Sequence, residues 1–197
     1  MDSKKYTVIY ADPPWSYRAG NVQGSAQNHY DTMSDEDLYA LPINELAEKD
    51  SVLFLWATFP KLEEAFQLIK SWGFSYKTVA FVWVKQNKTG KGLFFGLGWW
   101  TRSNAEICLL ATKGKPKRKS AKVSQLIVTP IEQHSKKPDI VRDKILELVG
   151  DVPRLELFAR QKTEGWDVWG NEVACDLDME GSEKNGLCSG SKRSDKG

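Results

Sequence analysis

The chain of 197 residues carries 28 Lys or Arg and 26 Asp or Glu, which gives a formal net charge of +2. This length accommodates one α/β domain with a sizeable core, and so small a charge does not by itself mark a nucleic-acid-binding protein. No signal peptide or transmembrane span is apparent, so we expect a cytoplasmic protein without a membrane partner. The cysteines lack metal-type spacing, so we expect no metal site; they are Cys108, Cys175 and Cys188.

The first predicted element is a buried strand at residues 6–11, which is rich in β-branched and aromatic side chains. It ends in the tetrapeptide Asp12-Pro13-Pro14-Trp15, which a parallel sheet would place at its ligand-binding carboxyl edge. The Asp12 carboxylate and a carbonyl held by Pro13 or Pro14 are acceptors, and neither proline has an N–H that would compete. Trp15 offers a flat face for a base that has left its helix.

These groups suit the methylation of an exocyclic amine. The NH₂ of adenine is a poor nucleophile because its lone pair is delocalised into the ring. Acceptors aimed at its two hydrogens would localise that lone pair toward a methyl donor. Such a transfer depends on positioning and electrostatics rather than on a covalent intermediate. The alternative is an ordinary turn after a strand, because short motifs have real false-positive rates.

Three helices are predicted from caps and from apolar periodicity. The first begins after the N-cap Ser34 and runs to about Ala47, with a break or kink at Pro42. The second covers residues 60–72, between a proline and a glycine. The third begins at residue 136 or 137 and ends at residue 150.

Between these helices lie further β-branched, apolar runs, which predict strands at residues 52–57, 76–85, 105–112, 123–128 and 155–159. Alternating strands and helices imply an α/β fold with a mostly parallel sheet flanked by helices. From about Ala174 onward the sequence is polar, so we expect a disordered tail at 174–197 after a domain at 1–173.

Basic residues cluster in one predicted loop, at Lys113, Lys115, Lys117, Arg118, Lys119 and Lys122. Such a run is about as often a solvated loop as a binding site. Because we expect a base-modifying site beside it, we interpret the loop as a phosphate contact, with Lys115, Lys117 and Arg118 as candidate ligands of nucleic acid.

Further short motifs follow in order: His29-Tyr30-Asp31-Thr32-Met33, Leu53-Phe54-Leu55-Trp56, Glu106-Ile107-Cys108-Leu109-Leu110, His134-Ser135-Lys136-Lys137-Pro138, Glu156-Leu157-Phe158-Ala159-Arg160 and Trp169-Gly170-Asn171-Glu172. The set resembles the N6-adenine methyltransferase family that includes the catalytic subunit of the eukaryotic mRNA methyltransferase and many bacterial and phage enzymes. The resemblance covers residues 5–173 and implies a Rossmann-like fold that uses S-adenosylmethionine. It also implies a permuted motif order, in which the cofactor-binding strand follows the catalytic strand.

The resemblance assigns five residues to the cofactor. Arg160 matches a position near S-adenosylmethionine, and Asn171 and Glu172 look like the pair that hydrogen-bonds its ribose and adenine. Lys137 matches a lysine that reaches the cofactor or the target site, and Asp12 would face the amino-acid end of the donor. The alternative for Asn171-Glu172 is a plain turn, and the alternative for Lys137 is a solvated lysine at a helix start.

The resemblance also implies substrate contacts. Glu106 corresponds to a carboxylate close to the target adenine, although a structural salt bridge with Arg102 is nearly as well supported. Tyr17 and Arg102 are further candidates for substrate binding. The glycine-rich stretch before Trp99 and Trp100 is typical of a mobile loop; in the family it lies near the target base, so either tryptophan would help to hold nucleic acid.

We therefore predict a one-domain enzyme that transfers a methyl group from S-adenosylmethionine to N6 of adenine in nucleic acid. DNA is the preferred substrate because so compact a chain resembles the small bacterial and phage members. RNA is the alternative, and a non-catalytic nucleic-acid-binding partner is a further one. So compact a chain would read only a short target sequence, or none, unless a homodimer or a partner subunit helps. His29 and His134 receive no catalytic role, since a neutral amine can accept the methyl group before it loses a proton.

Overall fold

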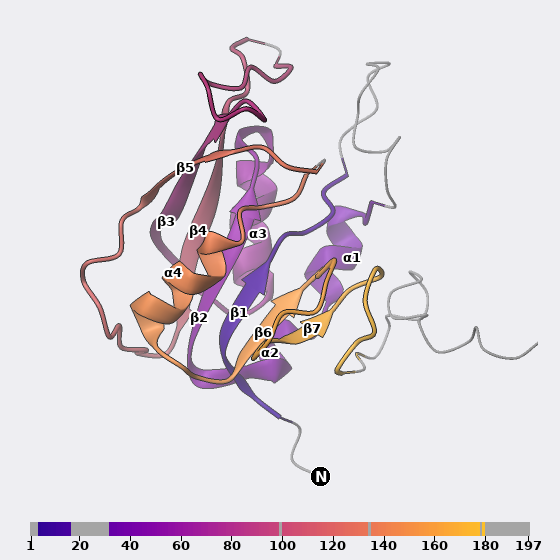
Figure 1. The fold of residues 1–197 in the computed structure, drawn as a ribbon. Coiled ribbons are helices and arrows are strands. Elements are labelled where there is room, and N and C mark those ends of the chain that lie inside the picture. Colours follow the sequence, from indigo (N-terminus) through magenta and orange to yellow (C-terminus); the bar gives the residue numbers. More distant parts are fainter. Residues whose placement is uncertain (1–3, 17–31, 99, 134, 178, 180–197) are drawn as a thin grey trace, which may run out of the picture.

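A computed structural model describes residues 4–16, 32–98, 100–133, 135–177 and 179. One mixed sheet with the strand order β5-β3-β4-β2-β1-β6-β7 forms its centre (Figure 1). Its strands are β1 Tyr6–Ala11, β2 Ala47–Ala57, β3 Ser75–Gln86, β4 Ala105–Lys113, β5 Leu126–Pro130, β6 Arg154–Leu157 and β7 Asp167–Trp169. Of these, only β4 runs against its neighbours, β2 and β3, and all other pairs are parallel.

Helices cover both faces of this sheet; they are α1 Asp35–Ala40, α2 Ile43–Leu46, the 3₁₀ turn η2 Phe59–Lys61, α3 Leu62–Ser71 and α4 Ile140–Val149. Apolar side chains of α1, α2 and α3 share one core cluster, and those of α4 share another. The alternation of side chains along each strand separates the two clusters. In β2, for example, Leu53 and Leu55 face α3, whereas Phe54 and Trp56 face α4.

The first predicted helix is shorter than expected, although its cap and its break are confirmed. Ser34 Oγ accepts the amide of Asp37 at 3.1 Å, and Pro42 separates α1 from α2. The chain then becomes β2 already at Ala47, five residues earlier than predicted, because Ala47 pairs with Tyr6 at the start of β1. The polar residues after Ala47 obscured this part of the strand in the sequence.

The last predicted helix also begins later than expected, at Ile140 rather than at residue 136 or 137. Pro138 explains the difference, because the residue before a proline is disfavoured in helical conformation. Lys137 is therefore in the loop before α4, where it faces the end of β1. The short strand β7 was not predicted, since three residues are too few to show a period.

The packed chain continues beyond residue 173, where we placed the domain boundary. Asp176 exchanges backbone and side-chain hydrogen bonds with Val168 of β7, at 3.0 Å each. Leu177 and Met179 contact the core cluster under α3. The rest of the predicted tail, residues 180–197, lies outside the described part of the chain. No helix among the described residues is long and apolar enough to cross a membrane.

Candidate active site

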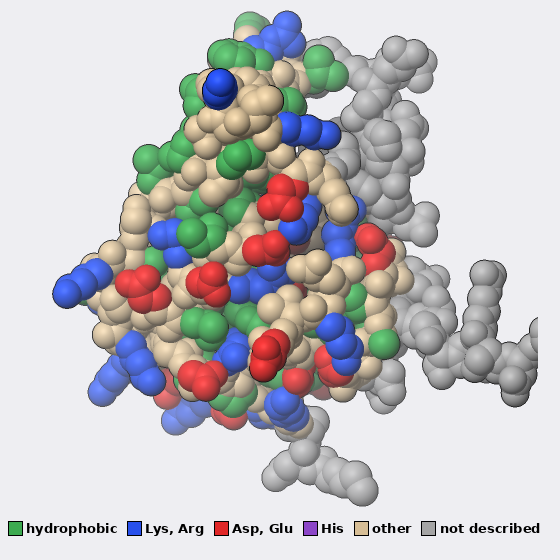
Figure 2. All heavy atoms as spheres, in the orientation of Figure 1, with side chains coloured by type: hydrophobic (Ala, Val, Ile, Leu, Met, Phe, Trp, Pro, Cys, Tyr) green, Lys and Arg blue, Asp and Glu red, His purple; other side chains and the backbone are tan. Residues whose placement is uncertain are grey.

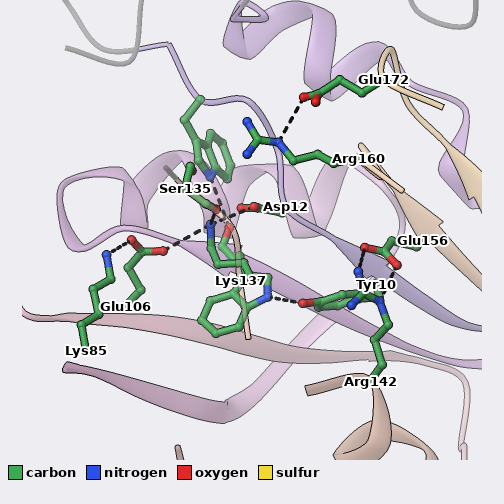
Figure 3. Close-up of polar contacts among 12 residues, drawn as sticks. Tyr10, Asp12, Lys85, Glu106, Ser135, Lys137, Arg142, Glu156, Arg160 and Glu172 are labelled. Atoms are coloured by element: carbon green, nitrogen blue, oxygen red, sulfur yellow. Dashed lines mark hydrogen bonds and ion pairs between the residues drawn. The ribbon is translucent and has the colours of Figure 1, made fainter. Parts of the chain in front are cut away.

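Four segments bring charged side chains to the carboxyl edge of the sheet, on the face that α4 covers (Figure 3). Asp12 directly follows β1, and Lys85 is near the end of β3. Glu106 is near the start of β4, which begins at this edge because β4 is antiparallel. Lys137 comes from the loop before α4. Side chains alternate between the two faces along a strand, so residues two positions apart share a face. Asp12, Lys85 and Glu106 are each two positions from a residue of the core cluster under α4, and they therefore lie on the face that α4 covers.

These four side chains form one chain of alternating charge. Lys137 Nζ is 2.8 Å from Asp12 Oδ2 and 3.3 Å from Glu106 Oε2, and Glu106 Oε1 also accepts a short hydrogen bond from Lys85. Lys137 also donates to the carbonyl of Ser135 at 3.3 Å and lies 5.6 Å from the centre of the Trp56 ring. The ammonium of Lys137 is thus held on several sides, which fixes its position relative to Asp12.

Burial and neighbouring charges shift the pKa values of these groups in opposite directions. Burial raises the pKa of the Asp12 carboxyl above its usual range, and the Lys137 ammonium offsets this only in part. Burial would also raise the pKa of Glu106, but Lys137 and Lys85 outweigh it and hold that pKa below its usual range. For Lys137, burial is outweighed by Asp12 and Glu106, so its pKa is raised. Lys137 therefore stays cationic at neutral pH.

Asp12 is the open end of the chain of charges. Its side chain is 32% exposed. Among the described residues only its Oδ2 has a hydrogen-bond partner, so Oδ1 can accept a further donor from a bound ligand. By contrast, Glu106 and Lys137 are nearly enclosed. A ligand at this edge would meet Asp12 first.

The turn after β1 presents its acceptors differently from the prediction. The Pro13 carbonyl accepts the amide of Trp15 at 2.8 Å, and the Pro14 carbonyl accepts the amide of Met33 at 3.0 Å. Each carbonyl oxygen has a second lone pair, which remains for a substrate N–H. Trp15 does not offer an open face, since it is only 5% exposed and donates its ring N–H to the Trp56 carbonyl at 3.2 Å.

The predicted cofactor residues after β6 and β7 meet at the same edge. Arg160 Nε is 3.1 Å from Glu172 Oε1, and Asn171 is exposed beside them. Two non-glycine residues of the described chain have positive φ: Ser135 at 62° and Phe158 at 60°. Each precedes a predicted site residue by two positions. Strained backbone of this kind clusters at functional sites, where surrounding structure enforces it.

Comparisons with known proteins identify the family of the chain. The sequence model of the MT-A70 family matches residues 6–172. The chain is 38% identical over 194 residues to the type II methyltransferase M.MunI of a Mycoplasma species, which covers 88% of this chain and 80% of that protein. The chain belongs to the MT-A70 family. Members of this family are N6-adenine methyltransferases that use S-adenosylmethionine, so the predicted family, enzyme class and cofactor are confirmed.

Two eukaryotic MT-A70 proteins are much longer than this chain. An N(6)-adenosine-methyltransferase MT-A70-like protein of Arabidopsis thaliana is 30% identical over 172 residues, and the match covers 85% of this chain but 24% of that protein. The human N(6)-adenosine-methyltransferase catalytic subunit METTL3 is 29% identical over 173 residues, with 86% of this chain and 28% of that protein covered. The present chain thus spans about a quarter of either eukaryotic protein.

Other predicted site residues of this MT-A70 protein do not join the row of charged side chains that includes Asp12 and Lys137. Arg102 is exposed on the segment between β3 and β4, and Glu106 pairs with Lys85 and Lys137 instead. The alternative of a structural bridge between Arg102 and Glu106 is therefore wrong. Tyr17 lies outside the described residues, as do His29, Trp99 and His134. Among the described residues, no group of three or more His, Cys, Asp or Glu could hold a metal ion.

The basic loop of the MT-A70 chain lies at the opposite edge of the sheet from Asp12. The amide of Lys115 donates to Asp50 Oδ1, near the start of β2, at 2.7 Å, and the amide of Lys119 donates to a carbonyl at the end of α4 at 2.8 Å. Our expectation of a loop beside the site is wrong, because the reversal of β4 carries its end to the amino edge. Contact of Lys117 and Arg118 with nucleic acid stays a prediction.

Sequence reasoning missed two residues of the site, Lys85 and Trp56. Lys85 donates a hydrogen bond to Glu106. The ring of Trp56 lies beside the Lys137 ammonium, and the Trp56 backbone carbonyl accepts the ring N–H of Trp15. Alternation alone could have found Lys85, since it shares a face with Trp83 on a predicted strand. Nothing in the sequence pairs it with Glu106, because that contact depends on the antiparallel register of β3 and β4.

Proposed function

We propose that this MT-A70 protein transfers a methyl group from S-adenosylmethionine to N6 of adenine in DNA. The observation that carries the proposal is the Asp12 carboxylate. It stands at the end of β1 with Oδ2 held by Lys137, and Oδ1 accepts no hydrogen bond from the described residues. DNA is favoured because the relative matched over 80% of its length is a type II methyltransferase, whereas the N(6)-adenosine-methyltransferases are matched over about a quarter.

The charged groups at this edge fit the zwitterionic donor. The amino-acid end of S-adenosylmethionine carries an ammonium and a carboxylate, which Asp12 and Lys137 complement in charge. Arg160, Asn171 and Glu172 offer donors and acceptors of the kind that a ribose and an adenine require. When bound, the cofactor supplies an electrophilic methyl group. The chain's own residues hold the donor so that this group faces the target amine.

The target adenine would be oriented by acceptors. Asp12 Oδ1 and the second lone pair of the Pro14 carbonyl would accept the two N6 hydrogens, which directs the nitrogen lone pair at the methyl group. Both acceptors are fixed before substrate arrives, because Lys137 holds one and the Met33 amide holds the other. Such fixed acceptors stabilise the developing charge at little reorganisation cost. Glu106 would border the base.

The arrangement of strands supports a Rossmann-like fold with a permuted motif order. The catalytic turn follows β1, and the residues assigned to the cofactor follow β6 and β7 later in the chain. β1 and β6 are nevertheless neighbours in the sheet, so both motifs reach one edge. We place the methyltransferase domain at residues 1–179, slightly longer than the sequence predicted, because residues 175–177 and 179 contact it.

The proposal is tested by transfer of labelled methyl groups to duplex DNA, single-stranded DNA and RNA, followed by analysis of the nucleosides. We expect N6-methyldeoxyadenosine in DNA, its loss in Asp12→Asn, and normal activity in the control Asp143→Asn, whose carboxylate is exposed on α4. Labelled methyl groups in RNA alone would show that the substrate is RNA rather than DNA. Cofactor binding without transfer to any substrate would indicate a required partner subunit. Absence of both cofactor binding and methyl transfer would contradict the proposal that this chain is an active methyltransferase.

A further inference from the structure

The segment between β3 and β4 exposes large apolar side chains beyond the sheet. Phe95 is 66% exposed, Leu97 71% and Trp100 100%, and Leu93 is exposed beside them. The segment projects past the carboxyl edge, the edge that carries Asp12 (Figure 1). Apolar side chains are visible around its tip (Figure 2). Large apolar side chains gathered in one exposed segment are a feature of interaction surfaces.

Backbone hydrogen bonds fold this segment back on itself, and we call residues 87–104 the hairpin. At its base the amide of Lys85 donates to the Asn104 carbonyl at 2.9 Å. The amide of Phe94 donates to the Lys85 carbonyl at 2.8 Å and closes a first turn, and the amide of Gly96 donates to the Ser103 carbonyl at 2.9 Å and closes the tip. A Cβ at Gly98 would lie 2.0 Å from the Thr101 carbonyl oxygen. Glycine is therefore required for the two sides of the tip to approach this closely.

The charge of this hairpin identifies the kind of partner. Residues 87–104 include the cations Lys88, Lys91 and Arg102 and no Asp or Glu. A polyanion with flat apolar faces complements such a surface, and nucleic acid has both features. A symmetric contact between two copies of the hairpin would instead bring its cations together, which like-charge repulsion opposes.

We propose that hairpin 87–104 enters duplex DNA beside the target adenine and occupies the gap that this base leaves. The inference rests on the proposed function, because an adenine within a duplex cannot reach Asp12 unless it leaves the stack. Its departure exposes the faces of the neighbouring bases, and apolar side chains that insert at a base step cover such faces. Phe95, Leu97 and Trp100 supply this contact, while Lys88, Lys91 and Arg102 bind the flanking phosphates.

The test compares two duplexes that differ at one position. In one, a mapped target adenine pairs with thymine; in the other, it faces an abasic site and is already unpaired. The variant is Phe95→Ala with Trp100→Ala, and the matched control is Leu126→Ala, an exposed apolar residue of the edge strand β5. We expect kcat/KM of the variant to fall about tenfold or more on the paired duplex and less than about threefold on the abasic duplex.

Several results would overturn this inference. An unchanged variant would show that the hairpin does not act on DNA, and equal losses on both duplexes would show that it binds without opening the stack. A variant that changes from dimer to monomer in light scattering, with normal methylation, would assign the surface to a second copy.

A binding measurement separates this inference from the proposed function. The probe is 2-aminopurine at the target position, whose fluorescence rises when the base leaves the stack. If the wild type methylates neither duplex, the proposed function fails, and the fluorescence decides about the hairpin. A rise that needs Phe95 and Trp100 would support the hairpin's role, and a rise that does not, or no binding at all, would exclude it.

Discussion

Two groups of buried charges lie on the same face of the sheet, and they are built in different ways (Figure 3). Under α4, Arg142 forms two parallel hydrogen bonds of 2.7 Å to Glu156 of β6, and its remaining nitrogen donates to Asp139 at 2.7 Å. At the carboxyl edge, Lys137 joins Asp12 and Glu106, and Asp12 uses one oxygen only among the described residues.

The comparison separates a structural pair from a site. Both oxygens of Glu156 are occupied and both partners are enclosed, so this pair can only fasten α4 to β6. The chain that includes Asp12 ends in a partly exposed carboxylate with unused hydrogen-bonding capacity. Both places pair a buried cation with carboxylates, but the Asp12 side chain is 32% exposed and that of Glu156 is 10% exposed. This exposure at the sheet edge is why we propose Asp12, and not Glu156, as the functional carboxylate.

The largest effect on stability is expected when the closed pair is broken. Arg142→Met leaves the Glu156 carboxylate buried without its partner, which we expect to lower the free energy of unfolding by about 3–5 kcal/mol. Urea unfolding measures this loss. The double variant Arg142→Met with Glu156→Leu removes both charges and should recover most of it. If the single variant were as stable as the wild type, the pair would not fasten α4.

The largest effect on activity is expected at the open end. Asp12→Asn keeps the shape of the side chain but removes its charge, and we expect methyl transfer to fall about 10²- to 10³-fold while unfolding in urea changes little. The wild-type rate should also decline at low pH from above the usual pKa of an aspartate, because burial raises the pKa of Asp12. Activity of Asp12→Asn within about threefold of wild type would exclude the proposed role.

Lys85 tests whether the chain of charges acts as one unit. Lys85→Met removes the outer partner of Glu106, which would then hold Lys137 more strongly and displace it from Asp12. We expect a loss of about tenfold, mainly in kcat, because the side chain positions the site without touching substrate. Lys85→Arg should restore part of the activity. A loss confined to stability, with kcat unchanged, would make Lys85 purely structural.

The smallest effect concerns stability in acid. Lys137 and Lys85 hold the pKa of Glu106 below its usual range in the folded chain. This carboxylate therefore contributes stability above its unfolded pKa, and the contribution is lost as the pH falls through the folded value. Asp12 and Glu156, whose pKa values burial raises, act with the opposite sign. Glu106→Gln should thus flatten the acid dependence of unfolding relative to wild type, and an unchanged slope would contradict the pairing.

The sequence by itself determined the elements that have strong local signals. The strand before Asp12, the cap at Ser34 and the break at Pro42 follow from side-chain chemistry within a few residues, and all three are found in the structure. The order of motifs likewise predicted the family, which the comparisons confirm. Local sequence signals did not predict elements that depend on neighbouring strands. The early start of β2 depends on its pairing with β1, and β7 is only three residues long, too short to show an alternating pattern.

Only the tertiary structure decided which charged residues meet. Because β4 is reversed, Glu106 comes to the edge of Asp12 and pairs with Lys85, while the basic loop after β4 is carried to the opposite edge. Trp15, which the sequence presents as an open stacking face, is instead buried in the core cluster that it shares with side chains of α1, α3 and the sheet. Strand direction and packing are properties of the whole sheet, and no single segment of the sequence encodes them.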